Sequence, residues 1–535
     1  MSIVFKDKPI FIGLPLKQLM SVKMKKLGIF LGIFFLVTHA NGFVKVPDII
    51  SSGMVLQQQA AVPIWGTALP GEAIKVSFAG QQHEAKADMS GNWVIYLDPM
   101  QASSEGRMMM IQGINSIHLK AVVVGEVWLC AGQSNMQLIL SMTSKGDSVI
   151  ASANYPQLHL FNVSRTNAFG HTSGKLGVWE PCTPNSVKEF SAAGYYFGLG
   201  LTKHLKVPVG IINASFGGSQ AEAWTPQAYL RIPELQPCID RDTLWASQRA
   251  DVQISYAKQL TDWKKYAEKE KAAGKKPKEA PHQPEALRDY RPTASIYNAM
   301  IAPLIPYKIK GCFWYQGENN EGRAEQYGVL LPTMIKAWRD KWNQQLPFGI
   351  IQLPNYRDKV AQPTDGAWSF LRDAQRRTAD SLKTTGLIVL IDAGEAHNIH
   401  PHNKQIVGER MLRWALATQY NAPILPSGPR FIKAVTKNGA MVVDFDITGT
   451  GLKTTDGSEP ESFALAGTDH KWYWAKAKII NKNEVRVWSE DVKNPVAVRY
   501  AFNNNPQNPN LTNDSGVPAA PFRSDNWTGP THGKK

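Results

Sequence analysis

Four polar segments of this chain each follow a short apolar run, and together they hold the residue types needed to transfer an acyl group. The first is Gly-Gln-Ser-Asn-Met at residues 132–136, directly after the apolar run 126–130. A serine that ends a strand and opens a helix exposes its hydroxyl, and its backbone N–H can bind an oxyanion. Ser134 could equally be a helix N-cap. The segment is not the Gly-x-Ser-x-Gly elbow, because Met136 holds the last position.

The second and third segments offer donors for a developing negative charge. Residues 213–219, Asn-Ala-Ser-Phe-Gly-Gly-Ser, contain paired glycines that allow close backbone approach, so Gly218 could present its N–H to an oxyanion. A tight strand-to-helix turn would use the same glycines. Residues 314–320, Trp-Tyr-Gln-Gly-Glu-Asn-Asn, offer the side-chain amide of Gln316, and we expect Trp314, Glu318 and Asn319 to contact a substrate. An ordinary loop with capping residues is the alternative.

The fourth segment holds three histidines within six residues, His397, His400 and His402. Their spacing is not that of a helical zinc motif, and Pro401 predicts a loop, so no metal is expected here. A single histidine acting as general base is the better interpretation, because an imidazole titrates near the working pH of most enzymes.

These segments must be brought together by the elements before them. Five near-continuous apolar runs, typical of strands buried on both faces, occupy residues 126–130, 207–212, 309–315, 348–353 and 387–391. Helix-capable stretches at 326–342 and 368–381 lie between them, which predicts an α/β domain with its site at the carboxyl ends of the strands. One parallel sheet would then place a nucleophile, oxyanion donors and a base at a single edge.

Sequence on either side of this core has β character. Alternating residues around 74–78 and 93–97 predict a sandwich, and the segments 431–436/441–445 and 475–480/485–488 predict hairpins, the first through Asn438-Gly439. Within the core, the charged stretch 244–290 predicts a solvated helix and loop, or a rim to the site. The predicted divisions are a leader and signal peptide at 1–42, a β-sandwich-like domain at 43–123, the α/β core at 124–426 and a β-rich domain at 427–535.

The beginning of the chain predicts export. Lys25 and Lys26 precede the apolar run 27–37 and a small-residue stretch, which is the pattern of a signal peptide rather than of a membrane span. We therefore expect a periplasmic or secreted protein with no membrane anchor. The formal net charge is +15, partly from lysines in this leader, and no basic stripe or nucleic-acid motif accompanies it.

The chain has four cysteines, too few to build a disulfide scaffold. Cys130 and Cys312 lie in apolar strand-like runs and are expected to be buried free thiols. Cys182 and Cys238 lie in loop-like sequence and could form a disulfide in an oxidising compartment.

The same four segments resemble the SGNH hydrolase superfamily and, within it, the sialate O-acetylesterase (SASA) family. The matching stretches are GEVWLCAGQSNM, NASFGGSQAEAW, YNAMIAPLIPYKIKGCFWYQGENN and IHPHNKQIVGERM. The resemblance implies a flavodoxin-like core, a parallel five-stranded sheet with helices on both faces, between N- and C-terminal β-domains. It also implies removal of acetyl groups from sugar hydroxyls through a serine acetyl-enzyme, with no cofactor.

By position, the resemblance makes Ser134 the nucleophile and His400 the base, with the Ser134 N–H, Gly218 and Gln316 forming the oxyanion hole. Many SGNH enzymes have Asp three residues before the catalytic histidine, where this chain has His397. Glu395 is therefore the first carboxylate candidate to orient His400, and Asn398, Asp392 or a backbone carbonyl are the others.

The expected substrate is an O-acetylated sugar or glycan. A sialic acid ester carries a carboxylate that an arginine would bind, and Arg291, Arg323 and Arg357 lie near the segments of interest. A neutral acetylated polysaccharide such as xylan is the alternative substrate. A carbohydrate-binding protein without catalysis is the alternative from another class.

Overall fold

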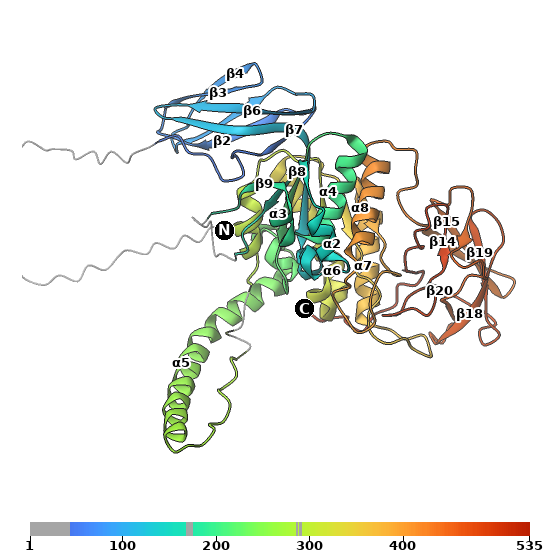
Figure 1. The fold of residues 1–535 in the computed structure, drawn as a ribbon. Helices are drawn as coiled ribbons and strands as arrows, with labels where there is room; N and C mark the ends of the chain where they lie inside the picture. The colour runs from blue at the N-terminus through green and yellow to red at the C-terminus, as the bar shows by residue number, and fades with distance from the viewer. Residues whose placement is uncertain (1–42, 167–174, 285–286, 288–290) are drawn as a thin grey trace, which may run out of the picture. The chain divides into compact units, whose positions relative to one another are not determined.

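The computed structural model describes residues 43–166, 175–284, 287 and 291–535 (Figure 1). The predicted leader at 1–42 lies outside the described residues. Among the described residues, no helix is long and apolar enough to cross a membrane.

A large twisted sheet forms the centre of the fold, and its strands lie in the order β13-β12-β11-β7-β10-β8-β9. All neighbouring pairs are parallel except β8 and β9. The strands are β7 (Ser116–Gly132), β8 (Tyr155–Asn162), β9 (Trp179–Cys182), β10 (Val209–Ser215), β11 (Gly311–Tyr315), β12 (Phe348–Ile351) and β13 (Thr385–Ile388).

The five predicted strands are all present as parallel neighbours, but the sheet has more strands than the five that were expected. Strand β8 continues the parallel sheet beyond β10, and antiparallel β9 ends it. The apolar pattern of β8 is broken by Pro156, Gln157 and His159, so no continuous buried run marks it in the sequence. Only its second half, from Leu158, is buried without interruption.

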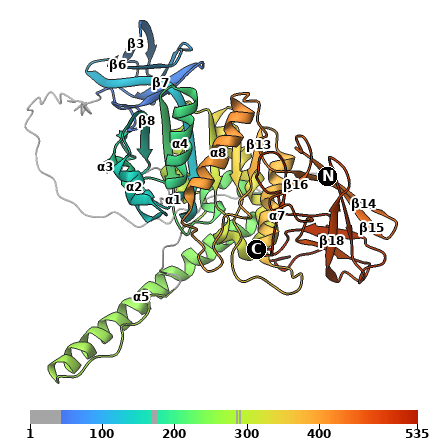
Figure 2. The same ribbon diagram turned by 45° about the vertical axis from the view of Figure 1, so that its right-hand side comes forward.

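Helices cover both faces of this sheet (Figures 1 and 2). On one face, Trp128 of β7 and Phe313 of β11 contact Phe197 and Trp414, which come from α4 (Ala192–Leu205) and α8 (Lys404–Gln419). The other face is covered by α6 (Ala324–Trp342) and α7 (Ala367–Ser381), which confirm the two predicted helices. Successive strand residues point to opposite faces, so Phe313 and its neighbour Trp314 pack on different helix layers.

The strands before the core continue directly into it. Strand β7 pairs with β6 (Ser103–Gln112) and β1 (Val55–Gln57) through its first half, and its second half forms the middle of the parallel sheet. The predicted boundary at 123/124 thus falls inside one continuous strand. Strand β3 (Ala73–Phe78) pairs with β4 (Gln81–Lys86) and β6, while β2 (Val62–Thr67) and β5 (Asn92–Leu97) form a separate ladder.

The C-terminal residues form a seven-stranded antiparallel sheet in the order β14-β15-β19-β18-β17-β20-β22. Both predicted hairpins are present, and Asn438 and Gly439 have positive φ angles of 50° and 69°, as a two-residue hairpin turn requires. The strands are β14 (Arg430–Lys437), β15 (Ala440–Asp446), β17 (Phe463–Ala466), β18 (Trp472–Ile479), β19 (Glu484–Trp488), β20 (Ala497–Tyr500) and β22 (Phe522–Arg523). Strands β16 (Lys453–Thr454) and β21 (Leu511–Thr512) pair separately.

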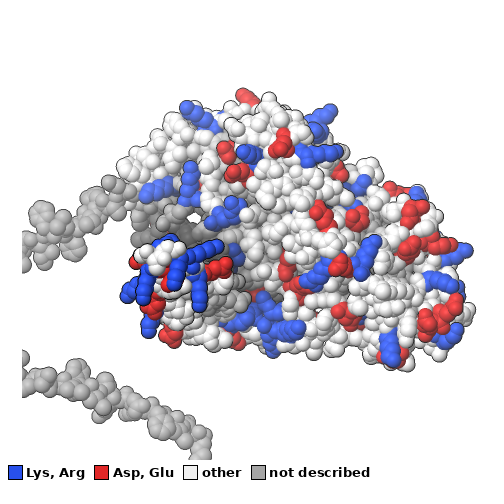
Figure 3. All heavy atoms as spheres, turned by 60° about the horizontal axis from the view of Figure 1, so that its bottom comes forward, with Lys and Arg blue, Asp and Glu red and all other residues white. Residues whose placement is uncertain are grey.

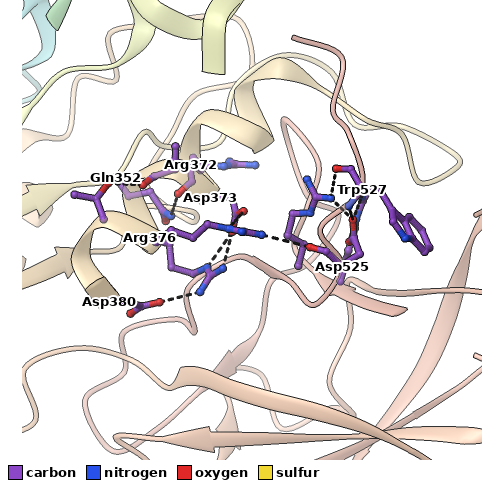
Figure 4. Close-up of polar contacts among 12 residues, drawn as sticks. Gln352, Arg372, Asp373, Arg376, Asp380, Asp525 and Trp527 are labelled. Atoms are coloured by element: carbon purple, nitrogen blue, oxygen red, sulfur yellow. Dashed lines mark hydrogen bonds and ion pairs between the residues drawn. The ribbon is translucent and has the colours of Figure 1, made fainter. Parts of the chain in front are cut away.

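A hydrogen bond connects the C-terminal residues to α7, and ion pairs lie on either side of it (Figure 4). Arg376 of α7 binds Asp373 at 2.7 Å, and Arg377 of the same helix donates to the backbone oxygen of Asp525. The Asp525 carboxylate in turn binds Arg499 at 3.0 Å. The Arg376 and Arg499 guanidinium groups are buried beside their carboxylates, whereas the Arg377 side chain that reaches Asp525 is exposed.

The charged insertion is a long solvated helix, α5 (Gln236–Ala272), that begins before the predicted segment. Only Cys238 and Ala267 of this helix are buried, and the chain returns along it with Trp263 donating to the Lys278 carbonyl. Figures 1 and 2 show the helix running away from the central sheet. Across the face drawn in Figure 3, blue and red side chains are interspersed and form no single basic stripe.

All four cysteines are free and buried. This confirms the prediction for Cys130 and Cys312 and corrects the suggestion of a disulfide between Cys182 and Cys238. The Cys238 sulfur lies 3.8 Å from the Gln326 amide oxygen, against the packed helix α6, and burial raises the pKa of both unpaired thiols.

Candidate active site

Ser134 lies where β7 ends and the short helix α1 (Ser134–Gln137) begins. The turn needs Gly132, whose φ is 143°, because a Cβ there would lie 2.1 Å from the Tyr315 carbonyl oxygen of the neighbouring strand. The turn presents the Ser134 hydroxyl at the carboxyl edge of the sheet. Across that edge, His400 Nε2 lies 2.8 Å from Ser134 Oγ, so two residues far apart in the chain are in hydrogen-bond contact.

His400 lies on the loop between β13 and α8 and is half-buried. Its backbone N–H donates to the Asn398 side-chain oxygen at 3.0 Å. Partial burial lowers the pKa of the imidazole from its ordinary value, and the nearby ammonium of Lys404 lowers it further. The ring is therefore neutral, and able to accept a proton, at a pH where a free histidine would be partly charged.

Glu395 does not reach the His400 ring, which corrects the expectation that it orients the imidazole directly. Its carboxylate accepts from the His402 backbone N–H at 2.7 Å and from the Asn398 amide at 3.1 Å. Asn398 then holds the His400 backbone. Glu395 thus braces the loop through Asn398, and among the described residues no carboxylate bonds to the imidazole.

Two backbone N–H groups beside the serine are free to donate. Within the described residues, neither the Ser134 N–H nor the Gly218 N–H has a protein acceptor. Gly217 packs against the serine, since a Cβ on it would lie 3.4 Å from the Ser134 Cβ, and its own N–H donates to Gln137 of α1 at 2.6 Å. The glycine turn is therefore fixed beside Ser134, where such donors could stabilise an oxyanion.

Gln316 is placed differently from its predicted role. Its side chain is fully buried, and its amide nitrogen already donates to the Ser219 carbonyl at 3.1 Å and to Asn320 at 2.7 Å. Both hydrogens of the amide are used, so the group is not available as an oxyanion donor in this structure. Its contacts instead tie the loop after β11 to the glycine turn after β10.

We expect the Gln316→Ala variant to lose stability rather than chemistry. Removing the amide leaves the Ser219 carbonyl without the donor that Gln316 supplies, while the Asn320 oxygen keeps its bond from the Ala221 N–H, and this loss costs roughly 1–3 kcal/mol in the free energy of unfolding. Urea unfolding measures this, with the exposed Gln345→Ala as the matched control. A variant of unchanged stability that turned over a hundredfold more slowly would restore Gln316 as an oxyanion donor.

The prediction that Trp314 contacts the substrate is wrong, while Glu318 and Asn319, the other two predicted contacts, lie near the site. Trp314 is fully buried and packs edge-on against Trp224 and Trp338, with ring centroids 5.5 Å and 5.8 Å away. Trp314 faces the α6 layer. Successive residues of a strand point to opposite faces of the sheet, so its position in the sequence did not decide between packing on α6 and lining a pocket. Glu318 is bonded to Asn135 at 2.5 Å, and exposed Asn319 donates to the Gly218 carbonyl at 3.0 Å.

A cavity of about 410 Å³ opens over the Ser134–His400 pair. Besides these two residues it is lined by three polar side chains that the sequence did not single out, Asn162, Arg165 and Glu189. The rest of the lining comes from Gln137, Leu138, Ile139, Met142 and Gly217. None of the described residues of the 244–290 insertion lines it. Within the described residues Arg165 is exposed and has no acidic partner.

No cluster of three or more metal-ligating side chains occurs among the residues that the structure describes. His397 is exposed and lies 3.6 Å from Asp358, and His402 binds Glu395, so the three histidines of this loop point to different partners.

Comparisons with known proteins agree on one family. The model of the carbohydrate esterase family of sialic acid-specific acetylesterases (SASA) matches residues 282–416, which contain Gln316 and His400. Human sialate O-acetylesterase is 25% identical over 88% of this chain and 91% of its own length, and the rat protein is 26% identical over 74% and 78%. The crystal structure of a carbohydrate acetylesterase from Xanthomonas citri is 32% identical, covers 91% of this chain and all of its own, and superposes with a TM-score of 0.76.

Proposed function

The chain belongs to the sialic acid-specific acetylesterase (SASA) family and is a serine-type carbohydrate O-acetylesterase, and we propose that it deacetylates O-acetylated sialic acid through Ser134 and His400. The observation that carries the catalytic assignment is the 2.8 Å contact between the Ser134 hydroxyl and the His400 ring at the mouth of a cavity. A neutral imidazole at this distance can remove the hydroxyl proton.

The reaction proceeds in two halves. His400 Nε2 takes the Ser134 proton while the serine oxygen attacks the acetyl carbonyl, and the protonated ring then gives that proton to the departing sugar oxygen. Water attacks the acetyl-serine in the second half, with His400 again as base, and acetate leaves. The N–H groups of Ser134 and Gly218 receive the oxyanion in both halves.

The histidine works in this scheme without a carboxylate on its second nitrogen. The third member of a serine triad orients and stabilises the imidazole but takes no proton, so a braced backbone can supply the orientation. Here the bonds from Asn398 to the His400 backbone and from Glu395 to Asn398 supply that brace.

Arg165 supports sialic acid as the substrate. The three arginines expected to bind a carboxylate are engaged elsewhere: Arg291 donates to the Gly218 carbonyl, while Arg323 and Arg357 bind Glu222 and Glu321. Arg165 lies on the wall of the same cavity as the serine, and a guanidinium binds a carboxylate with two parallel hydrogen bonds.

We expect Arg165→Gln to raise KM for O-acetylated sialic acid by about tenfold or more, because a hydrogen bond to a charged group contributes roughly 1.5–3 kcal/mol. KM for a neutral acetyl ester such as 4-nitrophenyl acetate should stay within about twofold. Acetate release measures both, and Arg231→Gln, an exposed arginine outside the cavity, is the matched control.

A neutral polysaccharide remains the alternative substrate, favoured by the presence of Glu189 in the same cavity, which balances the arginine charge. Comparing acetate release from O-acetylated sialic acid and from acetylxylan separates the two. Equal KM for sialic acid in the Arg165→Gln variant and the wild type would argue for the neutral substrate.

Three further proposals concern the whole chain. With β8 left out, the five predicted strands have the spatial order 2-1-3-4-5 when numbered along the chain, which supports a flavodoxin-like SGNH core that β8 extends beyond β10. The divisions 43–123, 124–426 and 427–535 are proposed as domains, on the change from β to α/β sequence and back. Export to the periplasm or medium is proposed from Lys25, Lys26 and the apolar run after them.

A further inference from the structure

Three buried polar side chains, Lys404, Asn135 and Glu318, form a hydrogen-bonded series next to the catalytic pair. The Lys404 ammonium donates to the Asn135 side-chain oxygen at 2.5 Å, and the Asn135 amide donates to Glu318 at 2.5 Å. The same amide also donates to the backbone carbonyl of Ile399 at 2.9 Å. Asn135 follows the nucleophile in sequence and Ile399 precedes the base, so this series joins the two halves of the catalytic pair.

Burying the Lys404 ammonium at this position is unfavourable for the stability of the fold. The side chain is only 1% exposed, and it is the first residue of helix α8, where the helix dipole is positive and a cation is unfavourable. Burial lowers the pKa of the ammonium to about 7, although Glu318 and Glu395 act in the opposite direction. A buried, destabilised cation beside a catalytic pair indicates a functional role.

We propose that Lys404 is a positioning residue for the catalytic pair: it fixes Asn135, which holds the Ile399 carbonyl and Glu318 and so sets the loop of His400 against Ser134. This inference rests on the proposed function, because it concerns the base of that reaction. Lys404 itself touches neither the serine hydroxyl nor the His400 ring among the hydrogen bonds of the described residues.

Asn135 can make these contacts only in one orientation. Its oxygen must accept from a donor and its two amide hydrogens must meet acceptors, and Lys404, Glu318 and Ile399 supply one donor and two acceptors. An ammonium has no acceptor capacity, so Lys404 fixes which way the amide points. Without the ammonium the Asn135 oxygen would be buried without a donor, and only the two bonds from its amide nitrogen to Glu318 and Ile399 would hold the side chain.

The charge of Lys404 has a second consequence. It lowers the pKa of His400, after the larger effect of burial, and so keeps the ring neutral at lower pH. Burial raises the pKa of Glu318, while the Asn135 hydrogen bond and Lys404 oppose that rise. The charged or titratable groups around His400 are Lys404, Glu318, Glu395 and His402, with Arg165 and Glu189 lining the same cavity.

The test uses hydrolysis of 4-nitrophenyl acetate, which needs the catalytic pair but no sugar recognition. We expect Lys404→Met to lower kcat between about tenfold and a hundredfold with KM within about twofold, since an error of about 1 Å in positioning costs about 10² in rate. The acid limb of the kcat/KM profile should move to higher pH, because removing a positive charge raises the pKa of His400.

The Lys404→Gln variant separates the effect of positioning Asn135 from the effect of the positive charge on His400. It keeps a side-chain N–H that can donate to Asn135 but carries no charge, so the acid limb should move as in Lys404→Met while kcat falls less. Lys308→Met is the matched control: Lys308 is partly buried with a pKa also lowered by burial, but it lies before β11, away from the cavity, and its profile should match the wild type.

A folded Lys404→Met protein with wild-type kcat and an unmoved acid limb would overturn the proposal. If Lys404→Met does not fold, the profile of Lys404→Gln decides, and an unmoved acid limb there also overturns it. Wild-type enzyme that hydrolyses 4-nitrophenyl acetate but no acetylated sugar would contradict the proposed substrate and leave this inference standing.

Discussion

We expect replacement of Ser134 with alanine to reduce kcat for acetate release from acetylated sugars roughly 10⁴-fold or more, with the fold intact. The expected size follows from serine hydrolases in general, where loss of the nucleophile costs on the order of 10⁶ in kcat. Ser134 is half-buried at the start of a short helix, and among the described residues its side chain hydrogen-bonds to His400 alone. The substitution therefore removes the reacting oxygen and little else.

The measurement is acetate release from an O-acetylated sugar, with thermal unfolding to confirm that the variant folds. Ser144→Ala is the matched control, because Ser144 is an exposed serine in the nearby loop after α1 and does not line the cavity. Residual activity in the Ser134 variant within tenfold of wild type would rule out a covalent serine mechanism.

The central sheet could be predicted from the sequence because its strands are buried on both faces. The five apolar runs became β7, β10, β11, β12 and β13, and they placed the four polar segments at one edge. Strand β8 could not be found in the same way, because Pro156 and Gln157 open it and only its second half is fully buried. The sequence also could not predict that β7 continues across residue 123, because a strand can change its partner strands without a change in its composition.

At the site, loop positions were easier to predict than side-chain directions. Ser134 and His400 meet as expected, because each ends or follows a strand of the same parallel sheet. The amide of Gln316 and the ring of Trp314 turn into the protein, which depends on packing against α6 and the glycine turn rather than on local sequence. Asn135 and Lys404 both lie in segments that the sequence had singled out, but a buried polar contact between them cannot be derived from spacing.

Arg165 shows what kind of residue escapes sequence reasoning altogether. It follows β8, the strand that the pattern missed, and lies outside the four polar segments. Because that strand was missed, the arginine that we propose binds the substrate was missed with it. The local signal for it was the short segment from Leu158 to Phe161, which is buried without interruption.

Replacing His400 with glutamine should reduce kcat by roughly 10⁴-fold or more, and adding Ser134→Ala should cause no further loss. Residues that act as one unit in catalysis are strongly non-additive, since either change alone removes the same step. His397→Gln is the matched control: it is an exposed histidine of the same loop, 3.6 Å from Asp358, and it should keep the wild-type rate.

The wild-type pH profile follows from the same residue. His400 must be neutral to take the Ser134 proton, and burial together with Lys404 lowers its pKa below the ordinary 6.5. Activity should therefore be lost only as the pH falls through a midpoint below 6.5, because protonation then removes the base. The measurement is kcat/KM for an acetyl ester between about pH 4 and 8, a range that spans the ordinary histidine pKa. An acid limb centred above 6.5 would mean that the ring sits beside a negative charge, contrary to the bonds seen around Glu395 and Lys404.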